Sequence, residues 1–234
     1  KTFKTNIIGT QNVLESCRGK KFIKNILIST TDKVYENTKV KRFKENDKLS
    51  GDDPYSASKA ATEILINAYS KCFLKNINIA TVRAGNVIGF GDYSKNRIIP
   101  DIINSIYSNK ILKIRQIESY RPWYNILDVI CAYLKLLLYI EKKNISFSNW
   151  NFSPKGYSKY TVKNIIYRLS QISKKNIQYK LLKGKFKFNE KKYLSLNSNK
   201  ALKKLKINNQ HIDQTLKQIY KLNELYYTNQ NVMT

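Results

Sequence analysis

The sequence predicts an α/β protein built on a parallel sheet that helices cover on both faces. Helical and strand-like patterns alternate along the amino-terminal part, with helices expected at 5–18 and 54–74 and strands at 22–29 and 77–82. Both strands are mainly apolar, which is typical of parallel strands buried on both faces. Because helices and strands alternate, the sequence favours strand–helix–strand crossovers within one sheet.

Each of these elements has its own signal. Apolar residues at helical spacing indicate the first helix. The run Phe-Ile-Lys-Asn-Ile-Leu-Ile-Ser at 22–29 is a short apolar strand, and a polar loop follows it to about residue 52. Asp53 and Pro54 supply a cap and a first-turn proline, so the next helix is expected to begin there. The strand at 77–82 leads directly into Arg-Ala-Gly-Asn-Val-Ile-Gly.

Beyond Gly91 the expected elements are shorter, which indicates a smaller lobe of mixed α and β structure. They are helices at 98–107, 126–141, 162–173 and 213–227, an extended segment at 111–115 and a strand at 150–152. We therefore expect one domain over residues 1–92. Residues 93–234 should form mainly the second lobe, with segments that return to the first domain.

Length and composition limit the class of protein. At 234 residues and 42% hydrophobic, the chain can bury one good core with a small added lobe. The longest apolar stretch, 126–140, is interrupted by Asp128 and Lys135, so no membrane span is expected. No secretory signal is recognisable. The three cysteines lie far apart without metal-ligand spacing, which favours free thiols in the cytoplasm and no bound metal.

The formal charge of +27 does not by itself predict a nucleic-acid-binding protein. Lysines are scattered through every segment, whereas a nucleic-acid surface gathers them in one stripe or interleaves them with stacking aromatic residues. Lys, Asn, Ile and Tyr are all abundant and share AT-rich codons, so genome composition explains the pattern. The positive field would still attract an anionic substrate.

Tyr55 and Lys59 lie four residues apart at the start of the second helix, so they share one helical face. A free tyrosine is a poor base at neutral pH, but a positive charge fixed beside a phenol favours the phenolate. The pair could therefore take a proton from a sugar or alcohol hydroxyl. The alternative is an ordinary exposed helix start, since a Tyr and a Lys at this spacing also occur by chance.

The strand at 22–29 ends in a polar run whose hydroxyls could reach the same substrate oxygen as Tyr55. The run is Ser29-Thr30-Thr31-Asp32-Lys33. Thr31 comes from the end of a neighbouring strand and would complete a site that removes a hydroxyl proton while a hydride leaves the same carbon.

No Gly-x-x-Gly-x-x-Gly occurs in the sequence. A doubly wound nucleotide-binding fold of the Rossmann type needs such a phosphate-binding turn after its first strand. Because the first helix and strand resemble the middle of such a sheet, we expect a truncated chain. About 90 residues, at about 30 per strand–helix–strand unit, would precede Lys1.

Seven runs of residues resemble the extended short-chain dehydrogenase/reductase family, in family order and across nearly the whole chain. They lie at 5–10, 31–37, 53–59, 82–92, 97–101, 121–123 and 150–154. The most specific are Arg-Ala-Gly-Asn-Val-Ile-Gly at 83–89 and Arg-Pro-Trp at 121–123, because most relatives that act on other nucleotide sugars differ there. Within the family, the chain is most similar to the 4,6-dehydratases that act on CDP-glucose.

The resemblance implies a lyase that keeps NAD bound and converts CDP-glucose to CDP-4-keto-6-deoxyglucose and water, for deoxysugar and lipopolysaccharide O-antigen synthesis. Tyr55, with Lys59 and Thr31, would take the carbon-4 hydroxyl proton while the hydride goes to NAD. The ketone acidifies carbon 5, water leaves from carbon 6, and the hydride returns there. Asp32 would protonate the departing hydroxyl and Lys33 would take the carbon-5 proton. The alternative for Lys33 is a solvated loop lysine.

The resemblance also implies residues that hold the ligands. Those expected at NAD are Ser29, Thr30, Tyr55, Lys59 and Arg83, which makes 1–92 the second half of an NAD-binding domain. Those expected at the nucleotide sugar are Asn86, Arg97, Arg121 and Trp123. The two arginines suit the diphosphate because guanidinium groups bind such oxygens in pairs. The alternatives are a surface ion pair for each arginine and a core position for the tryptophan.

Two positions depart from the family pattern. Phe90 stands in place of a glycine, and Tyr124-Asn125 stands in place of the Gln-His that usually follows Arg-Pro-Trp. The first could stiffen its loop, and the second removes a possible nucleotide contact.

Two other functions remain open. A sister enzyme, an epimerase, decarboxylase or dehydratase of another nucleotide sugar, would keep Tyr55 and Lys59 but should lack Lys33 and the Arg-Pro-Trp run. A non-catalytic fragment that binds a nucleotide sugar is the alternative from a different class, and we expect the 234 residues alone to be inactive. In relatives the helices that correspond to 5–18 and 55–74 pair across a two-fold axis, so a homodimer is expected.

Overall fold

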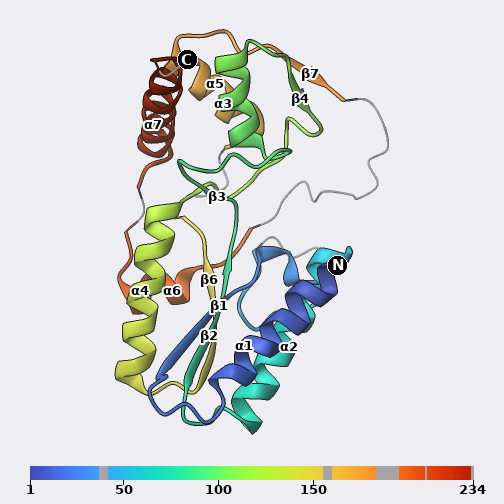
Figure 1. Ribbon diagram of the computed structural model, residues 1–234, viewed down its shortest axis with the longest axis vertical. Coiled ribbons are helices and arrows are strands. Elements are labelled where there is room, and N and C mark those ends of the chain that lie inside the picture. The colour runs from blue at the N-terminus through green and yellow to red at the C-terminus, as the bar shows by residue number, and fades with distance from the viewer. Residues whose placement is uncertain (37–41, 155–159, 183–194, 209, 233–234) are drawn as a thin grey trace. The chain divides into compact units, whose positions relative to one another are not determined.

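The computed structural model describes residues 1–36, 42–154, 160–182, 195–208 and 210–232. They form two compact units, each with a core of its own (Figure 1). Unit 1 takes its described residues from 1–85, 129–153 and 194–208, and unit 2 from 86–128, 154–193 and 209–234. The chain therefore passes between the two units several times.

Unit 1 is built on a three-stranded parallel sheet. Its strands are β1 (Asn25–Ser29), β2 (Asn78–Ala84) and β6 (Phe147–Phe152), in the order β1-β2-β6. In the register of the sheet, Leu27 lies opposite Ala80 and Val82 lies opposite Trp150. The central strand β2 is buried along almost its whole length, because it has a strand on each side and helices above and below. The parallel α/β sheet expected from the sequence is confirmed.

Helices cover both faces of this sheet (Figure 1). The helical segments with residues in unit 1 are η1 (Lys4–Ile8), α1 (Gly9–Cys17), η2 (Asp32–Val34), α2 (Pro54–Cys72), α4 (Ile126–Lys143) and α6 (Asn199–Leu205). On one face α1 and α2 join the sheet in an apolar cluster that contains Leu14, Ile66 and Ile79. On the other face Tyr139 of α4 packs edge-on against Trp150. This is the doubly wound arrangement that the sequence predicted.

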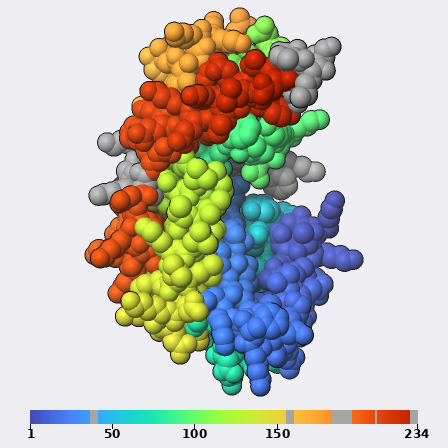
Figure 2. Space-filling model, turned by 60° about the vertical axis from the view of Figure 1, so that its left-hand side comes forward, coloured from blue at the N-terminus to red at the C-terminus, as the bar shows by residue number. Residues whose placement is uncertain are grey.

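The outer side of α4, the yellow-green column in Figure 2, is open to solvent. Ile130, Leu134 and Leu138 lie on it with 46%, 57% and 68% of their surfaces exposed. In the part of the chain that the structure describes, neither α4 nor any other helix has the combined length and apolar character of a membrane span.

Unit 2 joins short parallel strand pairs to three helices. The strands are β3 (Val87–Ile88) with β5 (Tyr124–Asn125), and β4 (Leu112–Ile114) with β7 (Tyr179–Leu181). The helices are α3 (Ile98–Ser108), α5 (Val162–Ser173) and α7 (Ile212–Val232). Their apolar sides meet in one core, in which Ile102, Ile165, Leu169 and Leu216 are fully buried.

The structure differs from the predicted elements in several places. The helix expected over 5–18 begins with the π-helical turn η1. The strand expected at 150–152 begins earlier, at Phe147. The short strands β3, β5 and β7, the turn η2 and the short helix α6 were not predicted. β7, for example, has only three residues, too few to show a strand period.

Candidate active site

The start of α2 is fixed by its cap. The carboxylate of Asp53 accepts hydrogen bonds from the backbone N–H of Tyr55 at 2.8 Å and of Ser56 at 3.1 Å, and the Ser56 hydroxyl bonds back to Asp53. Partial burial opposes the charge of Asp53, but the bonds from Ser56 and Tyr55 and the nearby Lys33 lower its pKa below the ordinary value. The cap sets where the helix begins, so it places Tyr55, which is 43% exposed, in the first turn.

Lys59 ties α2 to the carboxyl end of β1. Its Nζ donates a hydrogen bond to the carbonyl oxygen of Ser29 at 3.2 Å. The side chain is half-buried, and this burial lowers the pKa of Lys59 below the ordinary value of a lysine. The ammonium therefore lies against the strand end, one helical turn from Tyr55 along α2.

The residues that follow β1 form the short turn η2. Thr31 caps it, because its Oγ1 accepts a bond from the N–H of Lys33 at 3.4 Å and lies 3.2 Å from Oδ1 of Asp32. Thr31 and Asp32 are buried, whereas Lys33 is exposed. Since Lys33 is close enough to Asp53 to lower the pKa of that carboxyl, the turn lies beside the start of α2. The structure thus brings the strand end and the Tyr–Lys helix together.

The π-helical turn η1 supports α2 from the other side. Nδ2 of Asn6 donates to Oγ of Ser58 at 2.8 Å, and Oγ1 of Thr62 donates to the carbonyl oxygen of Asn6 at 3.1 Å. Ser58 in turn bonds the carbonyl oxygen of Tyr55 at 2.7 Å. A π-turn displaces the usual helical hydrogen bonds and often occurs at functional sites. Here η1 is bonded through Asn6 and Ser58 to the turn of α2 that carries Tyr55.

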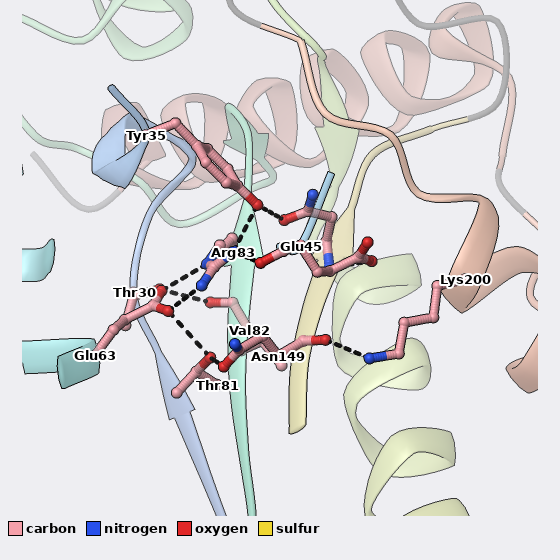
Figure 3. Close-up of polar contacts among 10 residues, drawn as sticks. Thr30, Tyr35, Glu45, Glu63, Thr81, Val82, Arg83, Asn149 and Lys200 are labelled. Carbon is pink, nitrogen blue, oxygen red and sulfur yellow. Dashed lines mark hydrogen bonds and ion pairs between the residues drawn. The ribbon is translucent and has the colours of Figure 1, made fainter. Parts of the chain in front are cut away.

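Two residues predicted at NAD have buried side chains bonded elsewhere. The guanidinium of Arg83 is 1% exposed and pairs with the carboxylate of Glu63 (Figure 3). The hydroxyl of Thr30, 8% exposed, donates to Oε1 of Glu63 at 2.6 Å. The expectation that these two side chains contact the cofactor is wrong for the structure, because each already serves the internal carboxylate of Glu63. Ser29 is exposed at the end of β1 and stays a predicted contact.

Trp123, predicted at the substrate, instead belongs to the core of unit 2. It is 5% exposed, and its Nε1 donates to the carbonyl oxygen of Tyr160 at 2.9 Å. The alternative of a core position is therefore the correct one. The large apolar ring packs in the interior and its single donor is satisfied there.

The other three residues predicted at the substrate keep surface in unit 2. Arg97 is exposed, with Nη1 3.4 Å from a carboxylate oxygen of Asp92. Arg121 is half-buried and donates to the carbonyl oxygen of Tyr120 at 2.7 Å. The half-buried Asn86 accepts a backbone bond from Tyr124 at 2.9 Å, which leaves its side-chain amide out of that bond. Contact of these three with a nucleotide sugar remains a prediction.

Both departures from the family pattern have structural consequences. Asn125 is buried, its Oδ1 accepts from the N–H of Leu127 at 2.8 Å, and its Nδ2 donates to Oγ1 of Thr215 at 3.1 Å. It therefore serves the start of α4. Phe90 is 41% exposed and packs edge-on against Tyr93.

The donor set at the end of β1 fits part of NAD. Ligands of parallel α/β sheets bind outside the carboxyl ends of the strands, and Ser29 and Ala84 end β1 and β2 there. An ammonium has three donors, so Lys59 can bond hydroxyls of a ribose as well as the Ser29 carbonyl. The exposed phenol of Tyr55 lies on the same helical face. These residues suit the nicotinamide-ribose end of the cofactor, and the glycine turn for its diphosphate is absent from the sequence.

The fold and this site define an NAD-binding α/β enzyme class in which a Tyr–Lys pair lies beside the end of a parallel strand. A model of the NAD dependent epimerase/dehydratase family matches residues 1–147. The chain belongs to this family, and NAD is the family's cofactor. The resemblance predicted from the sequence is thereby confirmed.

Relatives of known activity are similar over different shares of the chain. The CDP-glucose 4,6-dehydratase of Salmonella typhimurium is 35% identical over 209 residues, which are 86% of this chain and 58% of that protein. The dTDP-D-glucose 4,6-dehydratase of Dictyostelium discoideum is 34% identical over 55% of this chain and 31% of its own length. The chain thus spans well under two thirds of the length of these relatives.

Solved structures confirm the fold. The UDP-glucuronic acid 4-epimerase of Bacillus cereus, in complex with UDP-glucuronic acid and NAD, superposes with a TM-score of 0.84 at 24% identity, over 96% of this chain and 69% of that one. The dTDP-glucose 4,6-dehydratase of Bacillus anthracis, in complex with NAD, gives 0.79 at 22% identity, over 95% and 68%.

Proposed function

We propose that the full-length protein to which this chain belongs converts CDP-glucose to CDP-4-keto-6-deoxyglucose and water. The observation that carries the proposal is the turn Thr31-Asp32-Lys33 beside the start of the helix with Tyr55 and Lys59. The Asp-Lys pair after the threonine resembles the dehydratases that act on CDP-glucose. The 35% identity to such an enzyme, over 86% of the chain, supports the same substrate.

NAD, held by Ser29, Tyr55 and Lys59, would supply the hydride chemistry needed at carbons 4 and 6 of the sugar. Tyr55 takes the proton of the carbon-4 hydroxyl, and Thr31 bonds the same oxygen. Lys59 carries a positive charge one helical turn from Tyr55 and against the Ser29 carbonyl. Proton removal then depends on an arrangement that the cap of α2 and the strand end hold in place.

The elimination step needs an acid and a base of its own. Asp32 is buried at the strand end and is assigned to protonate the hydroxyl that leaves carbon 6. Lys33 is exposed beside Asp53 and is assigned to take the carbon-5 proton that the new ketone acidifies. Its exposure means that bound substrate must exclude water from this lysine before it can act as a base.

Each unit carries residues that we assign to one ligand. In unit 1, Ser29, Tyr55 and Lys59 are assigned to the nicotinamide end of NAD. In unit 2, Arg97 and Arg121 are assigned to the nucleotide diphosphate. Guanidinium groups suit diphosphate oxygens because two parallel N–H groups can bond them at once.

The test is a substrate survey with the full-length protein. CDP-glucose, dTDP-glucose, UDP-glucose and GDP-mannose are incubated separately, and the mass loss of one water is followed without consumption of added NAD. Preferential dehydration of CDP-glucose is the expected result. Preference for a nucleotide sugar other than CDP-glucose would overturn the choice of cytidine as the nucleobase and leave the dehydratase class intact. Epimerisation without water loss would overturn the class. The 234 residues alone should not turn over any of them.

We also propose a homodimer formed through η1, α1 and α2. Val13 and Ile64 lie on these helices with 56% and 64% of their surfaces exposed, and Ile8 is 44% exposed. Exposed apolar residues on adjacent helices are typical of a helix-bundle interface. A two-fold axis would bring the same surface of a second copy against them.

A further inference from the structure

One buried carboxylate connects α2 to two strands of the sheet. Glu63 lies on α2 and is 3% exposed. Its Oε1 accepts bonds from Oγ1 of Thr30 at 2.6 Å and from Nε of Arg83 at 2.7 Å, and its Oε2 pairs with Nη2 of Arg83 (Figure 3). The hydroxyl of Thr81 lies 3.4 Å from Oε2. The carboxylate thus receives donors from the end of β1 and from β2 at once.

Arg83 extends these contacts to the loop that follows β1. Its Nη1 donates to the hydroxyl of Tyr35 at 2.6 Å and to the carbonyl oxygen of Glu45 at 2.9 Å. Burial disfavours the guanidinium charge, but hydrogen bonds and attraction from Glu63 raise the pKa of Arg83 above its ordinary value. Burial, opposed by Arg83, raises the pKa of Tyr35 to about 12. This buried cluster therefore contains one ion pair, between Glu63 and Arg83, and the neutral phenol of Tyr35.

A buried ion pair of this kind does more to fix an arrangement than to increase stability. Removing two charges from water is costly, and the attraction between them offsets that cost only when the geometry is good and the remaining donors are satisfied. The pair of Glu63 and Arg83 meets both conditions through two parallel bonds and the contacts to Thr30 and Tyr35. A small shift of α2 along the sheet would break several of these bonds together.

The carboxylate lies on the helical face that carries the proposed catalytic pair. Tyr55, Lys59 and Glu63 follow one another at intervals of four residues, so all three point to the same side of α2. Two of these three residues, Lys59 and Glu63, form hydrogen bonds with consecutive residues at the end of β1. Lys59 bonds the carbonyl oxygen of Ser29, and Glu63 bonds the hydroxyl of Thr30. The next residue along the chain is Thr31.

We propose that Thr30, Glu63 and Arg83 form a positioning anchor that holds Thr31 in register with Tyr55 and Lys59. The anchor touches neither substrate nor cofactor and acts through the backbone of β1 and the rotation of α2. None of its three residues carries a chemical step, and the anchor acts on turnover only by positioning the residues that do. The kinetic test of the anchor needs a substrate and therefore rests on the proposed function. A second test measures a lysine titration and needs no substrate.

The kinetic test compares two buried threonine hydroxyls near the same carboxylate. Thr30 donates to Glu63 at 2.6 Å, whereas Thr81 lies 3.4 Å from Glu63 and donates to Oδ1 of Asn149 at 2.8 Å. Thr30→Val in the full-length enzyme removes the donor beside Thr31, and Thr81→Val removes an equally buried one from the middle of β2. Thr30→Val should lower kcat by roughly 10- to 100-fold with KM nearly unchanged, as expected for a small misplacement of reacting groups. Thr81→Val should keep the wild-type kcat. Thr30→Ser, which restores the hydroxyl, should recover most of the activity.

Melting temperatures of all variants separate positioning from folding. If kcat falls in Thr30→Val but not in a Thr81→Val protein of equal melting temperature, the proposal stands. If both variants lose activity in proportion to their loss of stability, or if neither loses any, the anchor has no positioning role and the proposal is overturned.

The second test does not need turnover. Lysine amines are dimethylated with ¹³C-labelled formaldehyde, and the titration of Lys59 is followed by NMR in the wild type and in Thr30→Val. In the wild type the pKa of Lys59 is below the ordinary value because of burial, so loss of register should raise it. If no nucleotide sugar is a substrate, the proposed function fails, and an unchanged Lys59 titration would still separately overturn the anchor.

Discussion

At the scale of single residues, the two lysines of the site lie in different surroundings. Lys59 is half-buried against the Ser29 carbonyl, and its pKa is lowered by that burial. Lys33 is exposed beside the carboxylate of Asp53. The first is placed to stabilise charge on its neighbour, Tyr55. The second can take a proton only after substrate covers it. Different steps of the reaction should therefore respond to their removal.

Tyr55→Phe removes the phenolic hydroxyl to which we assign the carbon-4 hydroxyl proton, and it leaves the helix face otherwise unchanged. Hydride transfer should fail with it, so turnover of CDP-glucose should fall by about 10²- to 10⁴-fold and no bound NADH should form. Stopped-flow absorbance of the cofactor measures this directly. Tyr167→Phe, at an exposed tyrosine of α5, is the matched control and should behave as the wild type.

Lys33→Ala should interrupt a later step. The ketone should still form, so absorbance of bound NADH should accumulate while loss of water slows. Lys48→Ala is the control, since that lysine is also exposed and forms a surface ion pair with Glu36. Normal turnover of Lys33→Ala would show that this lysine is only a loop residue, and Asp32 would become the first candidate for the carbon-5 base.

At the scale of elements, the cap of α2 gives a stability prediction with a defined pH dependence. Asp53→Ala should lower the free energy of unfolding by about 1 kcal/mol, because two backbone N–H groups lose their acceptor. The pKa of Asp53 is lowered in the folded protein, so the charge contribution is complete above the unfolded pKa of about 3.9. It disappears as the pH falls through the lower folded value.

Asp53→Asn provides the matched comparison for this cap. Asparagine is as good a cap as aspartate, so most of the stability at neutral pH should remain. The acid-dependent part of the cap's contribution to the unfolding free energy should be absent from Asp53→Asn. Urea unfolding curves between pH 2 and pH 7, a range of about five units around the ordinary pKa, distinguish this variant from the wild type. Equal pH profiles for the wild type and Asp53→Asn would contradict the assignment.

The ion pair that joins α2 to β2 predicts a strongly non-additive pair of mutations. Glu63→Met leaves the guanidinium of Arg83 buried without its carboxylate, which should cost about 3–5 kcal/mol of unfolding free energy. Glu63→Met combined with Arg83→Met removes both charges and should cost less than the single change. Chemical denaturation of the wild type, both single variants and the double variant gives the coupling energy. Additive losses would show that the pair is not coupled.

The sequence predicted the elements that carry apolar patterns and missed those that do not. The helices at 98–107 and 162–173 were expected because four apolar residues or more recur on one side of each, and the structure has them as α3 and α5. β7 has three residues, too few to show a period in the sequence, and it pairs in parallel with β4. The π-turn of η1 depends on its contacts with α2, which no local pattern encodes.

At the site, local spacing was enough for some residues and not for others. The shared face of Tyr55 and Lys59 follows from helical periodicity, and in the structure Lys59 bonds the end of β1. The side chains of Arg83, on β2, and Thr30, just after β1, bond the internal carboxylate of Glu63. Family likeness does not decide whether a side chain near a strand end points into the interior or toward a ligand. A charged residue at the buried face of α2, four positions after Lys59, was the signal for Glu63.

At the scale of the whole molecule, assembly is the property that the described surface predicts. In the homodimer that we propose, Val13 and Ile64 would lose contact with water, although they are 56% and 64% exposed in the single chain. Replacing either with a charged residue should therefore break the dimer, because an unpaired charge in an apolar interface is unfavourable. The sheet and its other helices should be unaffected.

Sedimentation of the full-length protein at micromolar concentration tests this assembly. The wild type should sediment as a dimer, and Val13→Glu and Ile64→Glu should sediment as monomers with unchanged far-ultraviolet circular dichroism. Leu138→Glu is the matched control, because that leucine is 68% exposed on α4, which covers the opposite face of the sheet. A monomeric wild type, or a dimer that Leu138→Glu disrupts while Ile64→Glu does not, would place the interface elsewhere.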